Sequence, residues 1–239
     1  FYFIVGITVF FSILNLGLMV WFAIKYRQRP GHQPQQSPKH STPLELFWTI
    51  IPTIIVLIVF AWGFRTFLHA YDPPPDSYTI TVQAKKWGWS FEYPNGVVTD
   101  DLYVPRGVPV KLLLTSSDVI HSLYVPAFRI KKDCVPGRTN VTWFEAKRVT
   151  EPDKGFPLYC TEYCGQQHAA MYRFVHVYEP DRFYDWVREE KNRQSNLSPV
   201  ERGQMLYRIK ACNTCHSIDG SDMTGPTLKN LYGYPRQFA

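Results

Sequence analysis

Two long apolar runs open the chain. Residues 1–24 are almost wholly apolar and carry no charged side chain; as a helix they would extend about 36 Å, enough to cross the hydrocarbon core of a bilayer. A second run covers residues 44–68, and its two charges, Glu45 and Arg65, lie near its ends. We therefore expect two membrane-spanning helices that form a hairpin over residues 1–70.

The segment between the two runs predicts how this hairpin is oriented. Residues 25–43 contain the basic side chains Lys25, Arg27, Arg29 and Lys39. Short loops rich in Lys and Arg stay on the cytoplasmic side of a membrane. Both outer ends of the hairpin, and with them the rest of the chain, are expected on the outer face.

After the second apolar run, the spacing of apolar residues changes to one typical of β-strands. Between residues 71 and 180, apolar and polar positions alternate in short segments, and turn signals such as P-N-G at 94–96 and P-R-G at 105–107 separate the early ones. Residues 86–93 hold four aromatic side chains and fit a strand with rings on both faces. Several short strands at close spacing predict a β-sandwich or barrel. The clearest strands are expected at residues 78–84, 108–114, 139–145 and 172–178.

The last part of the chain is helical in pattern. A charged segment with few apolar anchors predicts a surface or linker helix within residues 181–197. Ser198 is a good N-cap, Pro199 suits the first helical position, and Glu201 stands three residues after the cap. These signals predict a new helix that opens a separate domain over residues 198–239.

Charge and cysteine content narrow the classes of function. The formal net charge is +6, but no dense run of Lys and Arg accompanies it, so we expect no nucleic-acid partner. Four of the five cysteines fall into two spaced pairs, which favours metal or haem chemistry over a disulfide framework. Cys134 is left over and is expected to be a small buried residue. His176 lies in a strand pattern outside any motif and is expected to be structural.

The stretch Y-C-T-E-Y-C-G-Q-Q-H-A-A-M, residues 159–171, concentrates ligand chemistry. It offers two thiols, an imidazole and a thioether, from Cys160, Cys164, His168 and Met171. Such soft ligands favour copper over magnesium, calcium or manganese. His121, in D-V-I-H-S-L-Y-V-P, is the best candidate for a second imidazole. Two thiolates can bridge two copper ions, each completed by one His and one weak ligand.

Two other uses of the same cysteines stay open at this point. A disulfide between Cys160 and Cys164 is geometrically possible, but it leaves His168 and Met171 unexplained. A zinc site would use the two cysteines with His168 and His121, and would ignore the thioether.

A second site is predicted near the end of the chain. The motif C-x-x-C-H, formed by Cys212, Cys215 and His216, is the attachment motif of c-type haem. The two thiols would add to the haem vinyl groups and the imidazole would take the proximal position on the iron. A zinc knuckle or a redox-active C-x-x-C is the alternative. Met223 lies too close to reach across a haem, so we expect the distal ligand beyond residue 239, and both ends of the full protein beyond this sequence.

These motifs together resemble subunit II of the haem–copper cytochrome c oxidases. The resemblance covers residues 1–186 and rests on C-x-E-x-C-G-x-x-H-x-x-M, the upstream H-S-x-x-V-P, D-x-V-P-G-R at 133–138, and E-L-F-W-T-I-I-P, which begins at Glu45. G-P-T-L-K-N-L-Y-G at 225–233 is similar to the segment that follows C-x-x-C-H in small cytochromes c. The implied architecture is a membrane helical hairpin, an all-β cupredoxin domain (a Greek-key sandwich) and the N-terminal part of an all-α cytochrome c domain.

In that family the cysteine loop holds a binuclear copper A centre. The resemblance implies that the two cysteines bridge the coppers, each histidine ligates one, and Met171 and the backbone carbonyl of Glu162 are weak ligands. The side-chain carboxylate of Glu162 would also serve a magnesium site shared with subunit I. By position, the implied metal ligands are His121, Cys160, Glu162, Cys164, His168 and Met171.

The resemblance also assigns roles to two residues outside the metal loop. Glu45 would lie at the mouth of a proton path into subunit I; the alternative is a first-turn glutamate that complements the helix dipole. Trp87, in W-x-W-x-x-E-Y, would be the exposed tryptophan through which electrons enter from cytochrome c. Gly88 departs from the family pattern, because many relatives carry another aromatic residue there.

The implied function is electron entry into a respiratory haem–copper oxygen reductase. Electrons would pass from a covalent haem c to copper A and on to subunit I, where oxygen is reduced to water with proton pumping. The expected partners are subunit I, other oxidase subunits, the membrane, and an upstream donor, either cytochrome c or a quinol-oxidising complex. The expected location is the bacterial inner membrane, with both cofactor domains on the periplasmic side. The alternatives are an electron-entry subunit of a nitric oxide or nitrous oxide reductase, and a membrane-anchored copper carrier or assembly factor.

Overall fold

The computed structural model describes residues 1–31, 40–151 and 153–233. Much of the predicted cytoplasmic loop at 25–43 lies outside the described residues, as do the last six. The chain divides into two units, residues 1–68 and residues 69–239, which are described separately below.

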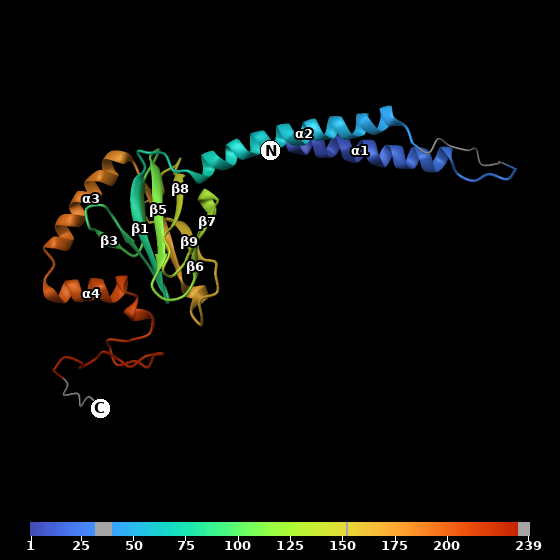
Figure 1. Ribbon diagram of the computed structural model, residues 1–239. Helices are drawn as coiled ribbons and strands as arrows, with labels where there is room; N and C mark the ends of the chain where they lie inside the picture. Colours follow the sequence, from blue (N-terminus) through green and yellow to red (C-terminus); the bar gives the residue numbers. More distant parts are fainter. Residues whose placement is uncertain (32–39, 152, 234–239) are drawn as a thin grey trace. The chain divides into compact units, whose positions relative to one another are not determined.

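The first unit is a pair of helices. Helix α1 spans Tyr2–Lys25 and α2 spans Thr42–Tyr71, which extends beyond the predicted run at both ends. Both are long and apolar enough to cross a membrane, as predicted. The rings of Phe3 and Trp62 lie 5.4 Å apart and pack one helix against the other. The two helices run side by side in Figure 1.

The second unit is built on two five-stranded sheets packed face to face (Figure 1). The first sheet has the order β3-β2-β1-β5-β8, and β1 and β5 run parallel while its other neighbours are antiparallel. Its strands are β1 (Tyr78–Lys85), β2 (Gly88–Glu92), β3 (Val98–Thr99), β5 (Pro109–Ser116) and β8 (Asn140–Glu145).

The second sheet has the order β4-β10-β9-β6-β7, and here β4 and β10 are the parallel pair. A sheet that mixes parallel and antiparallel neighbours in this way needs strands to cross from one sheet to the other, as in a Greek-key sandwich. Its strands are β4 (Leu102–Pro105), β6 (His121–Val125), β7 (Ile130–Cys134), β9 (Phe156–Cys160) and β10 (Tyr172–Tyr178).

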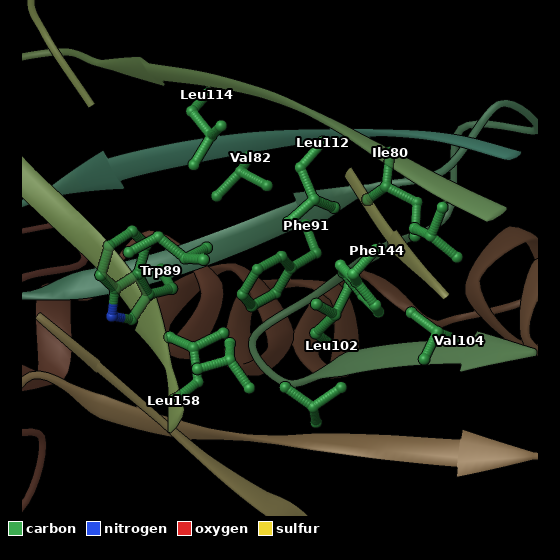
Figure 2. Packing of buried hydrophobic residues seen from close by; sticks show 14 of the residues in the cluster. Ile80, Val82, Trp89, Phe91, Leu102, Val104, Leu112, Leu114, Phe144 and Leu158 are labelled. Atoms are coloured by element: carbon green, nitrogen blue, oxygen red, sulfur yellow. The ribbon is translucent and has the colours of Figure 1, made fainter. Parts of the chain in front are cut away.

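Alternating apolar positions form the core between the sheets. In β5 every second residue is buried, which gives the period of two that a strand with one covered face requires. Figure 2 shows side chains of both sheets interdigitating, among them Trp89 and Phe91 from the first sheet and Leu158 from the second. The core therefore forms a rigid body beneath the loops that join the strands.

The four clearest predicted strands are present, as β1, β5, β8 and β10. The aromatic segment at residues 86–93 was also expected to form a strand, and its central part, Gly88–Glu92, is strand β2. The sequence did not single out β3, β4, β6, β7 and β9, all of which are short; β4 and β6 also pair with strands distant in sequence, β10 and β9 respectively.

Helix α3, Pro180–Ser195, packs on the sandwich and is not a free linker. Phe183 is fully buried, and the ring of Trp186 stacks on that of Tyr103 with centroids 4.3 Å apart. Gln194 exchanges two hydrogen bonds with the backbone of Val98, donating at 2.9 Å and accepting at 3.3 Å. The predicted linker is thus part of the second unit.

Helix α4, Pro199–Ile209, has the predicted start. Ser198 and Glu201 form a capping box, in which each side chain satisfies the backbone N–H of the other residue. The short 3-10 turn η3, Cys212–Thr214, follows. Among the residues described beyond η3, up to 233, the chain forms only turns and bends, so the structure shows the first helix of the predicted cytochrome c domain and no more of its fold.

Candidate metal and haem sites

Two strands bring the early histidine to the late cysteine loop. His121 begins β6, Cys160 ends β9, and the two strands pair antiparallel with Leu123 opposite Cys160. His121 is fully buried, and its Nδ1 atom lies 3.8 Å from Cys160 Sγ. Its other nitrogen, Nε2, lies 2.9 Å from a carboxylate oxygen of Asp118, which leaves Nδ1 free to bind a metal.

The other predicted ligands gather around the same two sulfur atoms. Cys160 Sγ and Cys164 Sγ are 3.8 Å apart, and Cys160 Sγ lies 3.3 Å from the carbonyl oxygen of Glu162. Cys164 Sγ lies 3.5 Å from His168 Nδ1 and 3.9 Å from Met171 Sδ. The ligand atoms of His121, Cys160 and Cys164 all lie within 4.8 Å of one another. The structure thus brings together all six groups that the sequence singled out.

Backbone hydrogen bonds hold this loop in shape. Cys160 N donates to the carbonyl of Met171 at 3.2 Å, and Thr161 N donates to Ser122 at 2.9 Å. The indole of Trp89 reaches the same Met171 carbonyl at 3.4 Å from within the core. Because these bonds start from strands and from a buried side chain, the rigid sandwich fixes the positions of the ligands before any metal binds.

The two thiols have opposite electrostatic environments. Burial pushes the pKa of Cys160 upward, but hydrogen bonds from His121 and from the backbone outweigh it and lower that pKa to about 6. The pKa of Cys164 is raised to about 12, first by burial and then by the neighbouring Cys160 thiolate. Since the thiolate is the metal-binding form, one sulfur is ready to bind and the second needs a cation to lose its proton.

The donor set decides between the three uses of these cysteines. Both thiols are free and stand nearly twice as far apart as the about 2 Å of a disulfide. A zinc site would leave the thioether of Met171 and the Glu162 carbonyl without a purpose. Two sulfurs, each with its own imidazole and its own weak donor, fit a pair of bridged copper ions.

Cys134 lies outside this donor set. It is fully buried in β7, opposite His121 in the sheet, and burial raises its pKa to about 12. The prediction of a small buried residue is confirmed. His176 is stacked on Tyr103 at 4.8 Å and pairs with Asp101 at 3.6 Å, which agrees with its expected structural role.

Trp87 is tied to the cysteine loop. Its indole N–H donates to the carbonyl of Cys164 at 3.2 Å, and its ring would lie 3.1 Å from a Cβ placed on Gly165. Gly165 also has φ +119, a backbone conformation that favours glycine. The glycine of C-G-x-x-H is therefore required both by this backbone conformation and by the close approach of the Trp87 ring. Lys86 N donates to Asp118 at 2.7 Å, so the residue before Trp87 shares a carboxylate with His121. Trp87 is half-buried, although the resemblance implied an exposed ring.

The C-x-x-C-H residues have the local geometry that a proximal histidine needs. The Nδ1 atom of His216 lies 2.7 Å from the carbonyl of Pro226, which holds the ring and leaves Nε2 for a metal. A Cβ on Gly225 would lie 2.6 Å from that ring, so the glycine of G-P-T-L allows the close approach. Cys212 and Cys215 are free thiols and partly exposed. These residues fit a covalently attached haem better than a zinc knuckle, which would need a fourth ligand.

Two glutamates keep roles that the structure leaves as predictions. Glu45 accepts a hydrogen bond from Ser41 N at 3.2 Å at the start of α2, which agrees with the helix-end interpretation. The side chain of Glu162 is exposed beside the cysteine loop. The proton path and the magnesium site remain predictions.

Fold and site define a β-sandwich protein with two candidate membrane helices and a thiolate–imidazole cluster whose donors suit copper. The family model for the periplasmic domain of cytochrome c oxidase subunit II matches residues 97–177, and the model for its transmembrane domain matches residues 1–66. The chain is 34% identical to cytochrome c oxidase subunit 2 of Alkalihalophilus pseudofirmus over 92% of this chain and 67% of that protein. It is 30% identical to a probable cytochrome c oxidase subunit 2 of Rickettsia bellii over 81% of this chain and 79% of that protein.

Among solved structures, the periplasmic domain of subunit II of cytochrome oxidase from Bradyrhizobium japonicum is 31% identical with a TM-score of 0.47, and the match covers 51% of this chain and 99% of that one. The chain belongs to the cytochrome c oxidase subunit II family. It is therefore a membrane protein with a periplasmic cupredoxin domain, and a partner of subunit I in an oxidoreductase complex. Membership implies the copper A centre and electron entry into the haem–copper oxidase, which decides against the reductase and carrier alternatives.

Proposed function

We propose that this subunit holds two cofactors and relays electrons from one to the other. The residues that would hold a binuclear copper A centre are Cys160, Cys164, His121, His168, the Met171 thioether and the Glu162 carbonyl. A haem c would be held covalently on Cys212 and Cys215, with His216 as its proximal ligand. The proposed relay runs from an upstream donor through the haem and the copper centre to subunit I, where oxygen is reduced with proton pumping.

One observation carries the copper assignment. The two thiols stand 3.8 Å apart, and each has its own imidazole nitrogen within 3.8 Å. When bound, copper A supplies a one-electron site with low reorganisation. The chain's own residues supply the rest: rigid placement by β6 and β9, tautomer selection by Asp118, and water exclusion by the buried Met171 and Trp89.

The remaining assignments complete the proposal. The exposed Glu162 carboxylate would bind magnesium together with subunit I, and Glu45 would mark the entrance of a proton path. Trp87, bonded to the Cys164 carbonyl, would be an electron-entry residue. The complex would lie in a bacterial inner membrane with both cofactor domains in the periplasm, and would take electrons from cytochrome c or a quinol-oxidising complex.

Copper, zinc and haem content per chain test this function. We expect two coppers, no zinc and one covalent haem c in the pyridine haemochrome spectrum. Cys164→Ser should remove copper and leave the haem, whereas Cys215→Ser should weaken haem attachment and leave copper. One copper or a zinc ion in the wild type would contradict the binuclear site, and copper without covalent haem would contradict the relay.

A further inference from the structure

The haem-attachment segment touches the copper loop through one side chain. The amide nitrogen of Gln167 donates to the carbonyl oxygen of Thr214 at 2.7 Å. Gln167 directly precedes the proposed copper ligand His168, and Thr214 lies between the two cysteines of C-x-x-C-H. A single hydrogen bond therefore joins the residues next to both proposed cofactors, across 47 positions of sequence.

A second contact brings the same two segments together. Ala211, the residue before Cys212, is buried, and its Cβ would lie 2.7 Å from a Cβ placed on Gly88. Only a residue without a side chain at position 88 permits this approach. Gly88 follows Trp87, so the segment lies on the surface where the resemblance placed electron entry. The departure of Gly88 from the family pattern thus has a structural cause.

A third set of contacts anchors helix α4, which precedes the haem-attachment segment, to the sandwich. Arg208 at the end of α4 pairs with Asp100 on the sandwich at 3.0 Å. Upstream of α4, Gln194 is bonded to the backbone of Val98 and is mostly buried. The exposed ion pair alone would contribute little. Together with the buried contact at Ala211, these interactions hold the loop against the sandwich, where Gln167 adds its hydrogen bond.

We propose that Gln167 is a positioning residue that docks the haem-attachment loop on the copper loop. The inference rests on the proposed haem and copper sites. The reaction that this docking would assist is the transfer of one electron from the haem, which is oxidised, to the copper centre, which is reduced. No bond is made or broken and no proton moves. The haem-attachment loop already contacts the sandwich beside Trp87, through Ala211 and Gly88. The hydrogen bond from Gln167 adds a second link, next to His168, and so keeps the distance between the two cofactors constant.

The test uses the complete oxidase with three variants. Gln167→Met keeps the length of the side chain and removes the N–H donor. Gln166→Met is the matched control, because the neighbouring side chain is exposed. Gln167→Lys restores a donor of similar reach. One readout is hydrogen exchange in the peptide that covers residues 210–217; the other is the rate of haem-to-copper electron transfer after rapid photoreduction.

In Gln167→Met we expect exchange to rise about fivefold, as for the loss of one net hydrogen bond. The transfer rate should fall about tenfold or more, since small displacements of a reacting pair have large effects. The copper and haem spectra should not change, Gln166→Met should match the wild type, and Gln167→Lys should recover most of both effects.

Unchanged exchange and rate in a fully loaded Gln167→Met would overturn the proposal. Loss of copper from that variant would also overturn it, because the side chain would then act within the copper loop. Wild-type protein without covalent haem would contradict the proposed function instead. The exchange readout needs no haem, so the two failures are distinguished.

Discussion

Asp118 lies 2.9 Å from the Nε2 atom of His121, while the Nδ1 atom of the same ring lies 3.8 Å from Cys160 Sγ. The carboxylate also accepts hydrogen bonds from Lys86 N and Val119 N, both at 2.7 Å. It therefore orients a proposed copper ligand and anchors the turn that carries Trp87. Burial pushes the pKa of Asp118 upward, but these hydrogen bonds outweigh it and keep that pKa below its usual range.

Replacing this carboxylate should weaken copper binding without removing a ligand. Asp118→Asn is expected to lower the copper affinity about 10- to 100-fold, the usual effect of losing a partner behind a metal-bound histidine. Competition with a copper chelator measures the affinity. Asp153→Asn, at an exposed position, is the control and should leave it unchanged. Equal affinities in the two variants would show that Asp118 does not orient the ring.

The contact between Gly88 and Ala211 should appear as a coupling between mutations. Gly88→Ala forces Ala211 away and should open the segment around it to proteolysis. Ala211→Gly removes the opposing Cβ, and glycine suits the left-handed backbone there, with φ 52. The double variant should recover most of the protection, with a coupling free energy of about 1 kcal/mol. Additive effects in limited proteolysis would mean that the two residues do not touch.

Cys134 should be dispensable for metal binding in spite of its place beside the site. Cys134→Ala is expected to retain both coppers and to lower the free energy of unfolding by about 1 kcal/mol, through loss of buried volume. Metal analysis and thermal unfolding measure the two quantities. Any loss of copper would make Cys134 part of the centre.

The pair of Asp101 and His176 gives the domain a dependence on acid pH. Burial pushes the pKa of Asp101 upward, but the ion pair with His176 and the hydrogen bond from Phe174 N outweigh it and keep that pKa below its usual value. Because the folded pKa is depressed, the stabilisation is fully present above the unfolded pKa and is lost as pH falls through the folded one.

Asp101→Asn should therefore reduce stability by about 1–2 kcal/mol at neutral pH, as expected for a hydrogen bond to a charged group. The difference from the wild type should narrow below about pH 4. Denaturant unfolding of both proteins between pH 7 and pH 3 measures it. A difference that stays constant over this range would assign the effect to packing alone.

The sequence was informative where ligands are close together along the chain. Cys160, Cys164, His168 and Met171 fall within one loop, and their spacing alone predicted that they would meet. His121 was found by its chemistry and by resemblance, but its placement depends on the pairing of β6 with β9, which no local pattern determines. The same limit explains why β4 was missed, because its partner β10 lies far along the chain, with Val175 opposite Leu102.

Contacts between distant segments could not be predicted at all. The bond from Gln167 to Thr214 joins two ordinary polar residues, neither of which stands out by type or spacing. Asp118 likewise gave no signal beyond its position three residues before His121. Gly88 was noticed as a departure, and a glycine within an aromatic strand is a recognised sign of close backbone approach. The partner that approaches could be identified only from the structure.

The burial of Ala211 on Gly88 also bears on which proteins can act as donors. At Gly88 that surface is already covered by Ala211 of the same chain, so a soluble protein cannot contact this position at the same time. Steric occlusion would then impose an order on the relay, with external donors meeting the C-terminal module and not the sandwich. Selectivity among donors would consequently evolve on a surface that is free to change without disturbing the copper ligands.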